Sequence, residues 1–175
     1  MRKSFEHAIA GHFDVDMLGQ AHWYLQSRIT QHANFDVSID QSRYIALIVS
    51  RFLPNHGVFG VTDAERQRYS APLPHNFVAS KKDRSEDYGQ VQKLQEEFGF
   101  EYPSVIGMLI YLMNTGFLLH FPISKLRKFS TPPGRRHFKA VQHLLRYLRC
   151  NHLNFGIRYY SNVTTLPMYQ LVKKE

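Results

Sequence analysis

The sequence is poor in cysteine: Cys150 is the only one among 175 residues. A lone cysteine excludes an internal disulfide, and a reducing compartment is the simpler setting for such a chain. The N-terminal stretch MRKSFEHAIAGHFDVD contains no apolar run of the kind that forms a secretory signal. We therefore expect an intracellular protein, cytoplasmic or nuclear, that is not secreted.

Long hydrophobic runs are also scarce. The longest, VIGMLIYLMNTGFLLHF at residues 105–121, is interrupted by Asn114, Thr115, Gly116 and His120. Its uninterrupted part is shorter than the roughly 20 apolar residues that a helix needs to cross a bilayer. The run predicts a buried helix that ends near Asn114, and no membrane partner is expected.

Catalytic and metal-binding motifs are missing as well. The chain contains no HExxH, CxxC, GxxxxGK[ST], GxGxxG or GxSxG pattern. Its ten histidines lack metal-ligand spacing, since His7 and His12, for example, are five residues apart rather than four. Asp14 and Asp16 precede a turn, which favours a structural role over Mg²⁺ binding. These motifs predict no catalytic residue, no metal site and no cofactor in this chain.

Positive charge, in contrast, is abundant. The 22 Lys and Arg residues exceed the 14 Asp and Glu residues, which gives a net charge of +8 and a pI near 9.7. The 43% hydrophobic and 21% charged content is typical of one folded globular domain. The charge excess favours an anionic partner, such as nucleic acid or lipid head groups.

The hydrophobic pattern predicts strands near the N-terminus and helices after them. A short helical piece at 4–12 precedes two β-prone runs, 21–30 and 35–41, and the separation by His32-Ala33-Asn34 predicts a hairpin. Helical spacing then predicts helices over 42–53, 89–99, 102–112, 122–129 and 135–149.

The helices are interrupted by one long irregular segment and followed by one more strand. The segment, residues 54–102, is rich in proline, glycine and charge, so we expect it to wrap a partner or to pack on a part absent from this chain. NFGIRYYS, at 154–161, predicts a strand. The expected fold class is α+β: an N-terminal β-hairpin followed by a mainly helical bundle with a short C-terminal strand.

The helix predicted at 135–149, RRHFKAVQHLLRYLR, divides into two faces at 100° per residue. The apolar face holds Phe138, Val141, Leu144, Leu145 and Leu148. The opposite face holds Arg135, Arg136, Lys139, His143 and Arg146, with Gln142 and Arg149 at its border. No Asp or Glu occurs between residues 125 and 158. This lack of acidic residues favours a face that contacts phosphates, although an ordinary solvated face has the same pattern.

Five sequence stretches between residues 10 and 160 occur in a familiar order. They are FDVDMLGQAHWYLQSRI, VSIDQSRYIALIVSRF, APLP, YPSVIGMLIYLM and HFKAVQHLLRYLR followed by FGIRYYS. Their order resembles the reverse transcriptase of copia-type LTR retrotransposons. That family has Phe-x-x-x-x-Leu-Gly, Gln-x-x-Tyr, a proline-containing loop, Gly-x-Leu-x-Tyr-Leu, and a histidine followed by Leu-x-Tyr-Leu. The family often continues with Arg-Pro-Asp after Gly-x-Leu-x-Tyr-Leu, whereas this chain has Thr115-Gly116-Phe117-Leu118.

The resemblance implies a place within the Pol polyprotein. The polymerase strand with its two metal-binding aspartates would precede this chain and the RNase H carboxylates would follow it, so Mg²⁺ is expected only in the missing polymerase core. The implied parts are 1–41, the end of the palm with a primer-grip-like hairpin; 42–103, a thumb-like helix and long loop; 104–160, a helical thumb/connection segment; and 161–175, a tail.

The resemblance also implies candidate contacts. Trp23, Arg28 and Gln41 lie on or beside the hairpin that would cradle the primer terminus, although hairpin packing and turn polarity are equally good explanations for each. Together with Arg135, Arg136, Lys139, His143, Arg146 and Arg149 they form the predicted nucleic-acid-binding set.

The expected function follows from this resemblance. It is a fragment of a retrotransposon RNA-directed DNA polymerase that binds an RNA–DNA or DNA primer–template duplex through its backbone phosphates. The remaining palm, fingers and RNase H domains of Pol would be its partners. A stand-alone basic nucleic-acid-binding module and a non-functional remnant of a decayed element are the alternatives.

Overall fold

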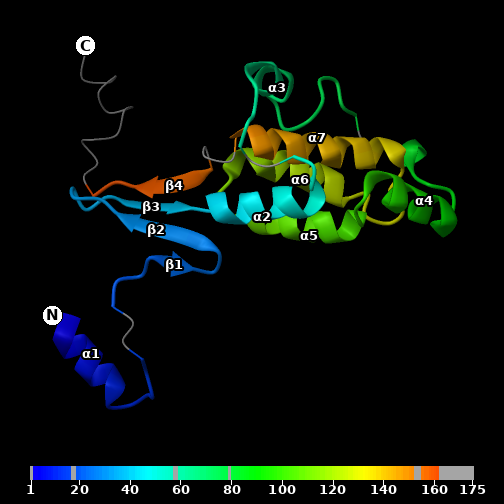
Figure 1. Cartoon of the computed structure of the whole chain (residues 1–175). Helices are drawn as coiled ribbons and strands as arrows, with labels where there is room; N and C mark the ends of the chain where they lie inside the picture. Colours follow the sequence, from blue (N-terminus) through cyan, green and yellow to red (C-terminus); the bar gives the residue numbers. More distant parts are fainter. Residues whose placement is uncertain (1, 17–18, 57–58, 79, 152–154, 162–175) are drawn as a thin grey trace, which may run out of the picture.

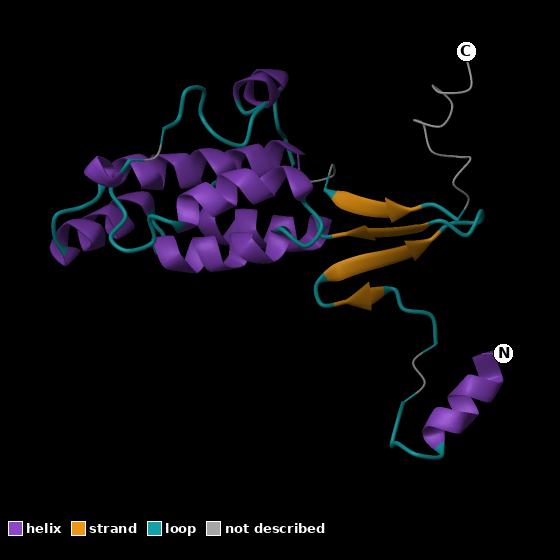
Figure 2. Ribbon diagram, turned by 180° about the vertical axis from the view of Figure 1, so that it is seen from behind, coloured by secondary structure: helices purple, strands orange, loops and turns teal. Residues whose placement is uncertain are grey.

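The computed structural model describes residues 2–16, 19–56, 59–78, 80–151 and 155–161. Of the predicted tail at 161–175, all but Ser161 lies outside the described residues. The described part contains seven α-helices and a four-stranded antiparallel sheet, which confirms the α+β prediction. The sheet extends from one end of a helical bundle rather than being covered by it (Figures 1 and 2).

The sheet joins the N-terminal hairpin to a strand from near the C-terminus. Its strands are β1 (Trp23–Tyr24), β2 (Ser27–Gln31), β3 (Val37–Asp40) and β4 (Gly156–Tyr159), in that spatial order. Strands β2 and β3 form the predicted hairpin, and β4 pairs antiparallel with β3 as an edge strand. The run predicted at 21–30 is split in two because Leu25 and Gln26 adopt positive φ angles of 46° and 61°, as in a two-residue hairpin turn.

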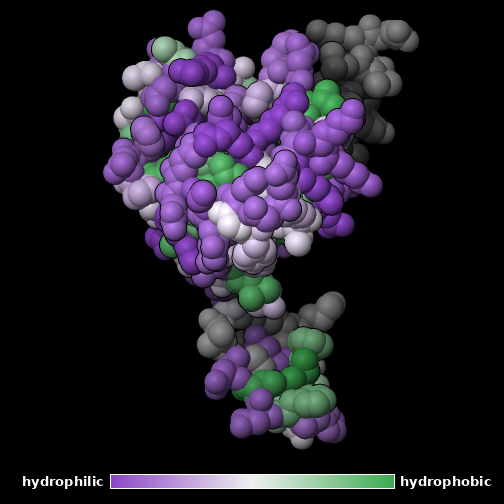
Figure 3. Space-filling model, turned by 90° about the vertical axis from the view of Figure 1, so that its right-hand side faces the viewer, coloured by the Kyte–Doolittle hydropathy of each residue, from purple (hydrophilic) through white to green (hydrophobic). Residues whose placement is uncertain are grey.

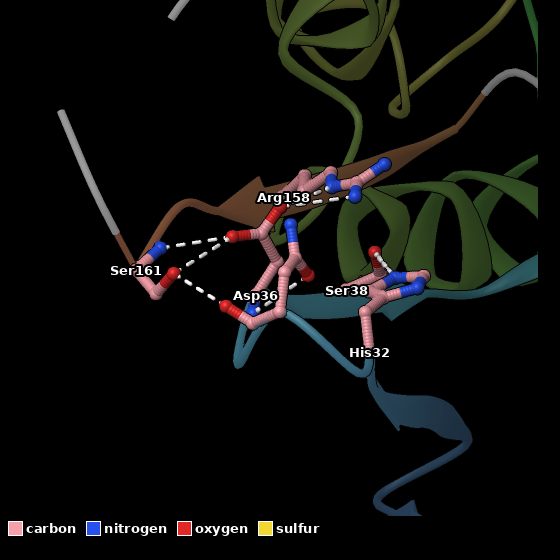
Figure 4. Close-up of polar contacts among 6 residues, drawn as sticks. His32, Asp36, Ser38, Arg158 and Ser161 are labelled. Carbon is pink, nitrogen blue, oxygen red and sulfur yellow. Dashed lines mark hydrogen bonds and ion pairs between the residues drawn. The ribbon is translucent and has the colours of Figure 1, made fainter. Parts of the chain in front are cut away.

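One buried carboxylate ties β4 to the β2–β3 turn (Figure 4). The Asp36 side chain accepts hydrogen bonds from Arg158 Nη2 and from the Ser161 backbone N–H, both at 2.9 Å. The backbone hydrogen bond from Ser161 lowers the pKa of Asp36, and burial opposes this shift. The paired carboxylate holds the C-terminal strand in register with the hairpin.

The bundle is built from four helices that share one core: α2 (Ser42–Phe52), α5 (Tyr102–Leu112), α6 (His120–Arg127) and α7 (Arg135–Asn151). The structure confirms the helices predicted at 42–53, 102–112 and 135–149. The predicted apolar face of α7 is completely buried, because Phe138, Val141, Leu144, Leu145 and Leu148 have no exposed surface.

Three further helices lie outside this core bundle. Helix α1 (Arg2–Ala10) lies apart from the bundle, and α4 (Tyr88–Phe98) ends, as predicted, at Gly99, whose φ is 73°. Helix α3 (Asp63–Arg68) was not predicted. It begins with a capping box, in which the Thr62 hydroxyl accepts from the Glu65 N–H and Glu65 accepts from the Thr62 N–H.

The long segment at 54–102 packs on α7 of the same chain. Helices α3 and α4 and the 3₁₀ turn Lys81–Asp83 all contact α7. The Arg66 guanidinium donates to the Cys150 carbonyl at 2.9 Å, and the buried Ser85 hydroxyl donates to the Pro133 carbonyl at 2.7 Å. We expected this segment to wrap a partner or to pack on an absent part. For α3, α4 and the turn Lys81–Asp83 this expectation is wrong, because they pack on α7 of the same chain.

Candidate nucleic-acid interface

The polar face of α7 is neutralised in part by acidic residues from distant segments. Arg135 Nη1 lies 2.6 Å from Glu97, Arg136 Nη1 lies 3.5 Å from Asp83, and Arg149 Nη1 lies 2.6 Å from Glu65. The sequence has no acidic residue near these arginines along the chain, but the folded chain brings three acidic residues to them. Part of the positive charge of this face is therefore paired within the chain.

Three residues of the predicted set are engaged around Tyr69, at the end of α3. Arg146 Nη1 donates to the Tyr69 hydroxyl at 2.6 Å, and His143 Nε2 lies 3.0 Å from the Ala71 carbonyl. Burial lowers the pKa of His143, so the imidazole is neutral at pH 7 and adds no positive charge. The Arg149 side chain is only 9% exposed. His143 and Arg149 are therefore engaged within the chain, and their assignment as phosphate contacts stays a prediction.

Gln41 is likewise engaged within the chain. It is 1% exposed, and its amide oxygen accepts a hydrogen bond from the Thr115 hydroxyl at 2.6 Å. Thr115 belongs to the stretch in which this chain departs from the copia-type pattern. Gln41 thus anchors the start of α2 to the end of α5 and presents nothing to a ligand.

Trp23 and Arg28, in contrast, lie on an accessible face of the sheet. They are cross-strand partners, so their side chains share one face. Trp23 is 44% exposed, and the guanidinium of Arg43 lies 4.3 Å from the centre of its ring. Arg28 is exposed and donates through Nε to Asp40 at 2.8 Å, which orients its guanidinium. The sheet thus presents an aromatic ring with two arginines beside it.

Strand pairing adds a residue that sequence reasoning missed. Ser38 pairs with Thr30 on one side and with Arg158 on the other, which places Arg158 on the same face as Arg28. A hollow of about 280 Å³ lies on this face, lined by Arg28, Ser38, Ile39, Asp40, Ser42, Phe155, Gly156, Ile157 and Arg158. A Cβ atom at Gly156 would lie 3.0 Å from the Ile39 carbonyl oxygen, so a side chain at this position would be crowded against β3. We name Trp23, Arg28, Ser38, Arg43 and Arg158 the sheet site.

The sheet site is suited to a phosphate-bearing strand. Guanidinium groups bind phosphate oxygens through paired N–H donors, and the exposed indole offers a stacking surface for a base. The Ser38 hydroxyl, which hydrogen-bonds His32 Nε2 at 2.7 Å (Figure 4), supplies a further polar group on the strand between those of Arg28 and Arg158.

The structure does not bring the two predicted sets together. Helix α7 begins at the end of the bundle remote from the sheet, near α4, so Arg135 and Arg136 are far from β1 (Figure 1). That remote end is covered mainly by hydrophilic side chains (Figure 3). Lys139, Arg135 and Arg136 stay exposed, but they form a surface separate from the sheet site.

Within the described ranges, no group of three or more His, Cys, Asp or Glu side chains is arranged to hold a metal ion. Nor does any helix in the described part of the chain have the length and apolar character needed to cross a membrane.

No protein-family model, curated protein or solved structure matches this chain. The likeness to copia-type reverse transcriptases therefore rests on the sequence motifs alone.

Proposed function

We propose that this chain binds nucleic acid as a thumb and connection fragment of a copia-type reverse transcriptase, with the sheet site as its contact to the primer strand. The observation that carries the proposal is the open sheet face on which Arg28 and Arg158 line one hollow beside Trp23. The net charge of +8 and the order of the sequence motifs support it.

The proposed recognition is by backbone and shape. Arg28 and Arg158, which are ion-paired with Asp40 and Asp36, contact phosphates through their remaining N–H donors. Trp23, held by Arg43, stacks on a base or sugar without selecting a sequence. Arg135, Arg136 and Lys139 are a separate secondary surface for the duplex, weakened by the ion pairs to Glu97 and Asp83. The missing palm, fingers and RNase H domains would supply the chemistry and the remaining contacts.

A stand-alone nucleic-acid-binding module is the second candidate function. A specific observation favours it over a remnant that needs absent domains: one core joins residues of α2, α5, α6 and α7 with Phe155 near β4. A chain whose own residues complete its hydrophobic core is expected to fold without the rest of Pol.

Removing both arginines of the sheet site is expected to weaken binding of an RNA–DNA hybrid. Each neutralised phosphate contributes about 0.9 to the slope of log K against log salt, so R28Q/R158Q should lower that slope by about 2. Fluorescence anisotropy with a labelled hybrid at several NaCl concentrations measures both affinity and slope. Circular dichroism checks folding, since Asp40 and Asp36 lose their partners in this variant.

The matched control is R51Q/R127Q, which removes two exposed arginines outside the sheet site. This variant loses the same positive charge as R28Q/R158Q, but it should keep most of the slope of log K against log salt. Equal loss in both double variants would mean that only net charge drives binding, and the sheet site would have to be abandoned.

Residues 1–175 alone are expected not to extend a primer, because none of their carboxylates matches the pair of metal-binding aspartates that the resemblance implies for the polymerase core. A primer-extension assay with Mg²⁺ and with Mn²⁺ measures this. Robust synthesis that copies the template would contradict the fragment assignment.

A further inference from the structure

A second concave, positively charged feature lies between α3 and α7, apart from the sheet site. This pocket has a volume of about 280 Å³ and is lined by His56, Ala64, Glu65, Arg68, Tyr69, Arg146 and Arg149. We name it the arginine pocket. Three of its seven lining residues are arginines, contributed by two elements that are far apart in the sequence.

The arginines are held in place by Tyr69, which is itself buried. The guanidinium carbons of Arg68 and Arg146 lie 5.7 and 5.6 Å from the centre of the Tyr69 ring, and Arg146 also donates to the Tyr69 hydroxyl. Cation–π contacts of this kind restrict the guanidinium positions without neutralising their charge. The pocket is thus organised in advance of any ligand.

The single carboxylate of the pocket is already occupied. Glu65 accepts hydrogen bonds from the Thr62 N–H at 3.0 Å and from Arg149 at 2.6 Å. The hydrogen bond from Thr62, followed by that from Arg149, lowers the pKa of Glu65, so it stays ionised at neutral pH. Among the described residues, no carboxylate lies within 4 Å of Arg68 or Arg146. Two guanidinium charges are therefore gathered beside one ring without an acidic partner, and their mutual repulsion would be relieved by a bound anion.

We propose that the arginine pocket binds a phosphate group, with Arg68 and Arg146 as the charged donors and the Tyr69 hydroxyl as a third polar contact. Two uncompensated positive charges match a phosphate dianion better than a carboxylate. Planar guanidinium forks donate in pairs to its oxygen atoms. The proposal does not depend on the sheet site, since the two share no residue.

Titration with inorganic phosphate at constant ionic strength tests the proposal. In ¹⁵N-labelled protein, the arginine Nε–H signals of Arg68 and Arg146 should shift in a saturable way, and the signal of Arg51 should stay. R68Q should weaken phosphate binding by about tenfold or more, the loss expected for one charge-assisted hydrogen bond. Arg68 is exposed and its guanidinium lies against the Tyr69 ring, so this variant is expected to fold.

R51Q is the matched control, because Arg51 is also exposed and its guanidinium lies 5.4 Å from the centre of the Phe52 ring. It should bind phosphate as the unchanged protein does, while R146Q should behave like R68Q. Shifts that never saturate, or equal weakening in R51Q and R68Q, would overturn the proposal. Competition by a 5′-phosphorylated dinucleotide, but not by its 5′-hydroxyl form, would identify a terminal phosphate as the source, whereas competition by neither would support free phosphate.

Discussion

Replacing Phe138 by alanine is expected to lower the free energy of unfolding by about 3–5 kcal/mol, the usual cost of deleting a fully buried aromatic ring. Phe138 has no exposed surface, and its ring centre lies 5.3 Å from those of Phe98 and Tyr102 and 5.4 Å from that of Phe100. This aromatic cluster joins α7 to α4 and to the start of α5. The substitution removes the ring and leaves a cavity that three rigid rings cannot close.

Urea unfolding followed by circular dichroism measures the effect. The matched control is F121A, because Phe121 lies on α6 and is 65% exposed. It should change stability by no more than about 0.5 kcal/mol, as is typical for surface positions. If F138A lost no more unfolding free energy than F121A, the placement of α7 against this cluster would be wrong.

Replacing Gly134 by alanine is the second large expected effect. A Cβ atom at this position would lie 1.7 Å from the Asp83 carbonyl oxygen, a backbone atom that no rotamer change can move. The turn Lys81–Asp83 would have to withdraw from the start of α7, breaking the Ser85–Pro133 hydrogen bond and the Arg136–Asp83 pair. Overpacking typically costs ~1–3 kcal/mol, and a backbone clash of this size should cost about 3 kcal/mol or more.

The control for this variant is G107A, because a Cβ at Gly107 would meet nothing within 4 Å on the exposed side of α5. Alanine favours a helix over glycine by ~1 kcal/mol, so G107A should be slightly stabilised. The two variants are compared by the same urea unfolding measurement. If G134A were as stable as the unchanged protein, the close approach of residues 81–85 to α7 would be wrong.

Helix α7 shows where reasoning from sequence succeeds. Its apolar positions recur at helical spacing, and every residue assigned to that face is buried. The same logic located α2, α5 and α4 with its Gly99 end, because periodicity and capping depend only on residues a few positions apart. Helix α3 was missed for the complementary reason: none of its residues is buried, so it has no apolar stripe. Its Thr-x-x-Glu capping signature was nevertheless present at Thr62 and Glu65, and would have located it.

The residues of the sheet site could be predicted only in part, because their positions depend on contacts between segments that are distant in the sequence. Trp23 and Arg28 were identified from the hairpin, but Arg43 and Arg158 were not, since their positions follow from a side-chain contact and from the pairing of β3 with β4. Gln41 was a candidate because the resemblance places it beside the primer-terminus hairpin, whereas the structure buries it with a hydrogen bond from Thr115.

The order of amino acids was enough to establish the α+β class, the inward faces of α2, α4 and α7 and the excess of positive charge, because these depend on composition and short-range spacing. Folding of the whole chain decided which carboxylates meet the arginines of α7 and which arginines keep an open, concave surface. Glu65, Asp83 and Glu97 are remote from α7 along the chain, and Coulomb interactions act through space rather than along the sequence.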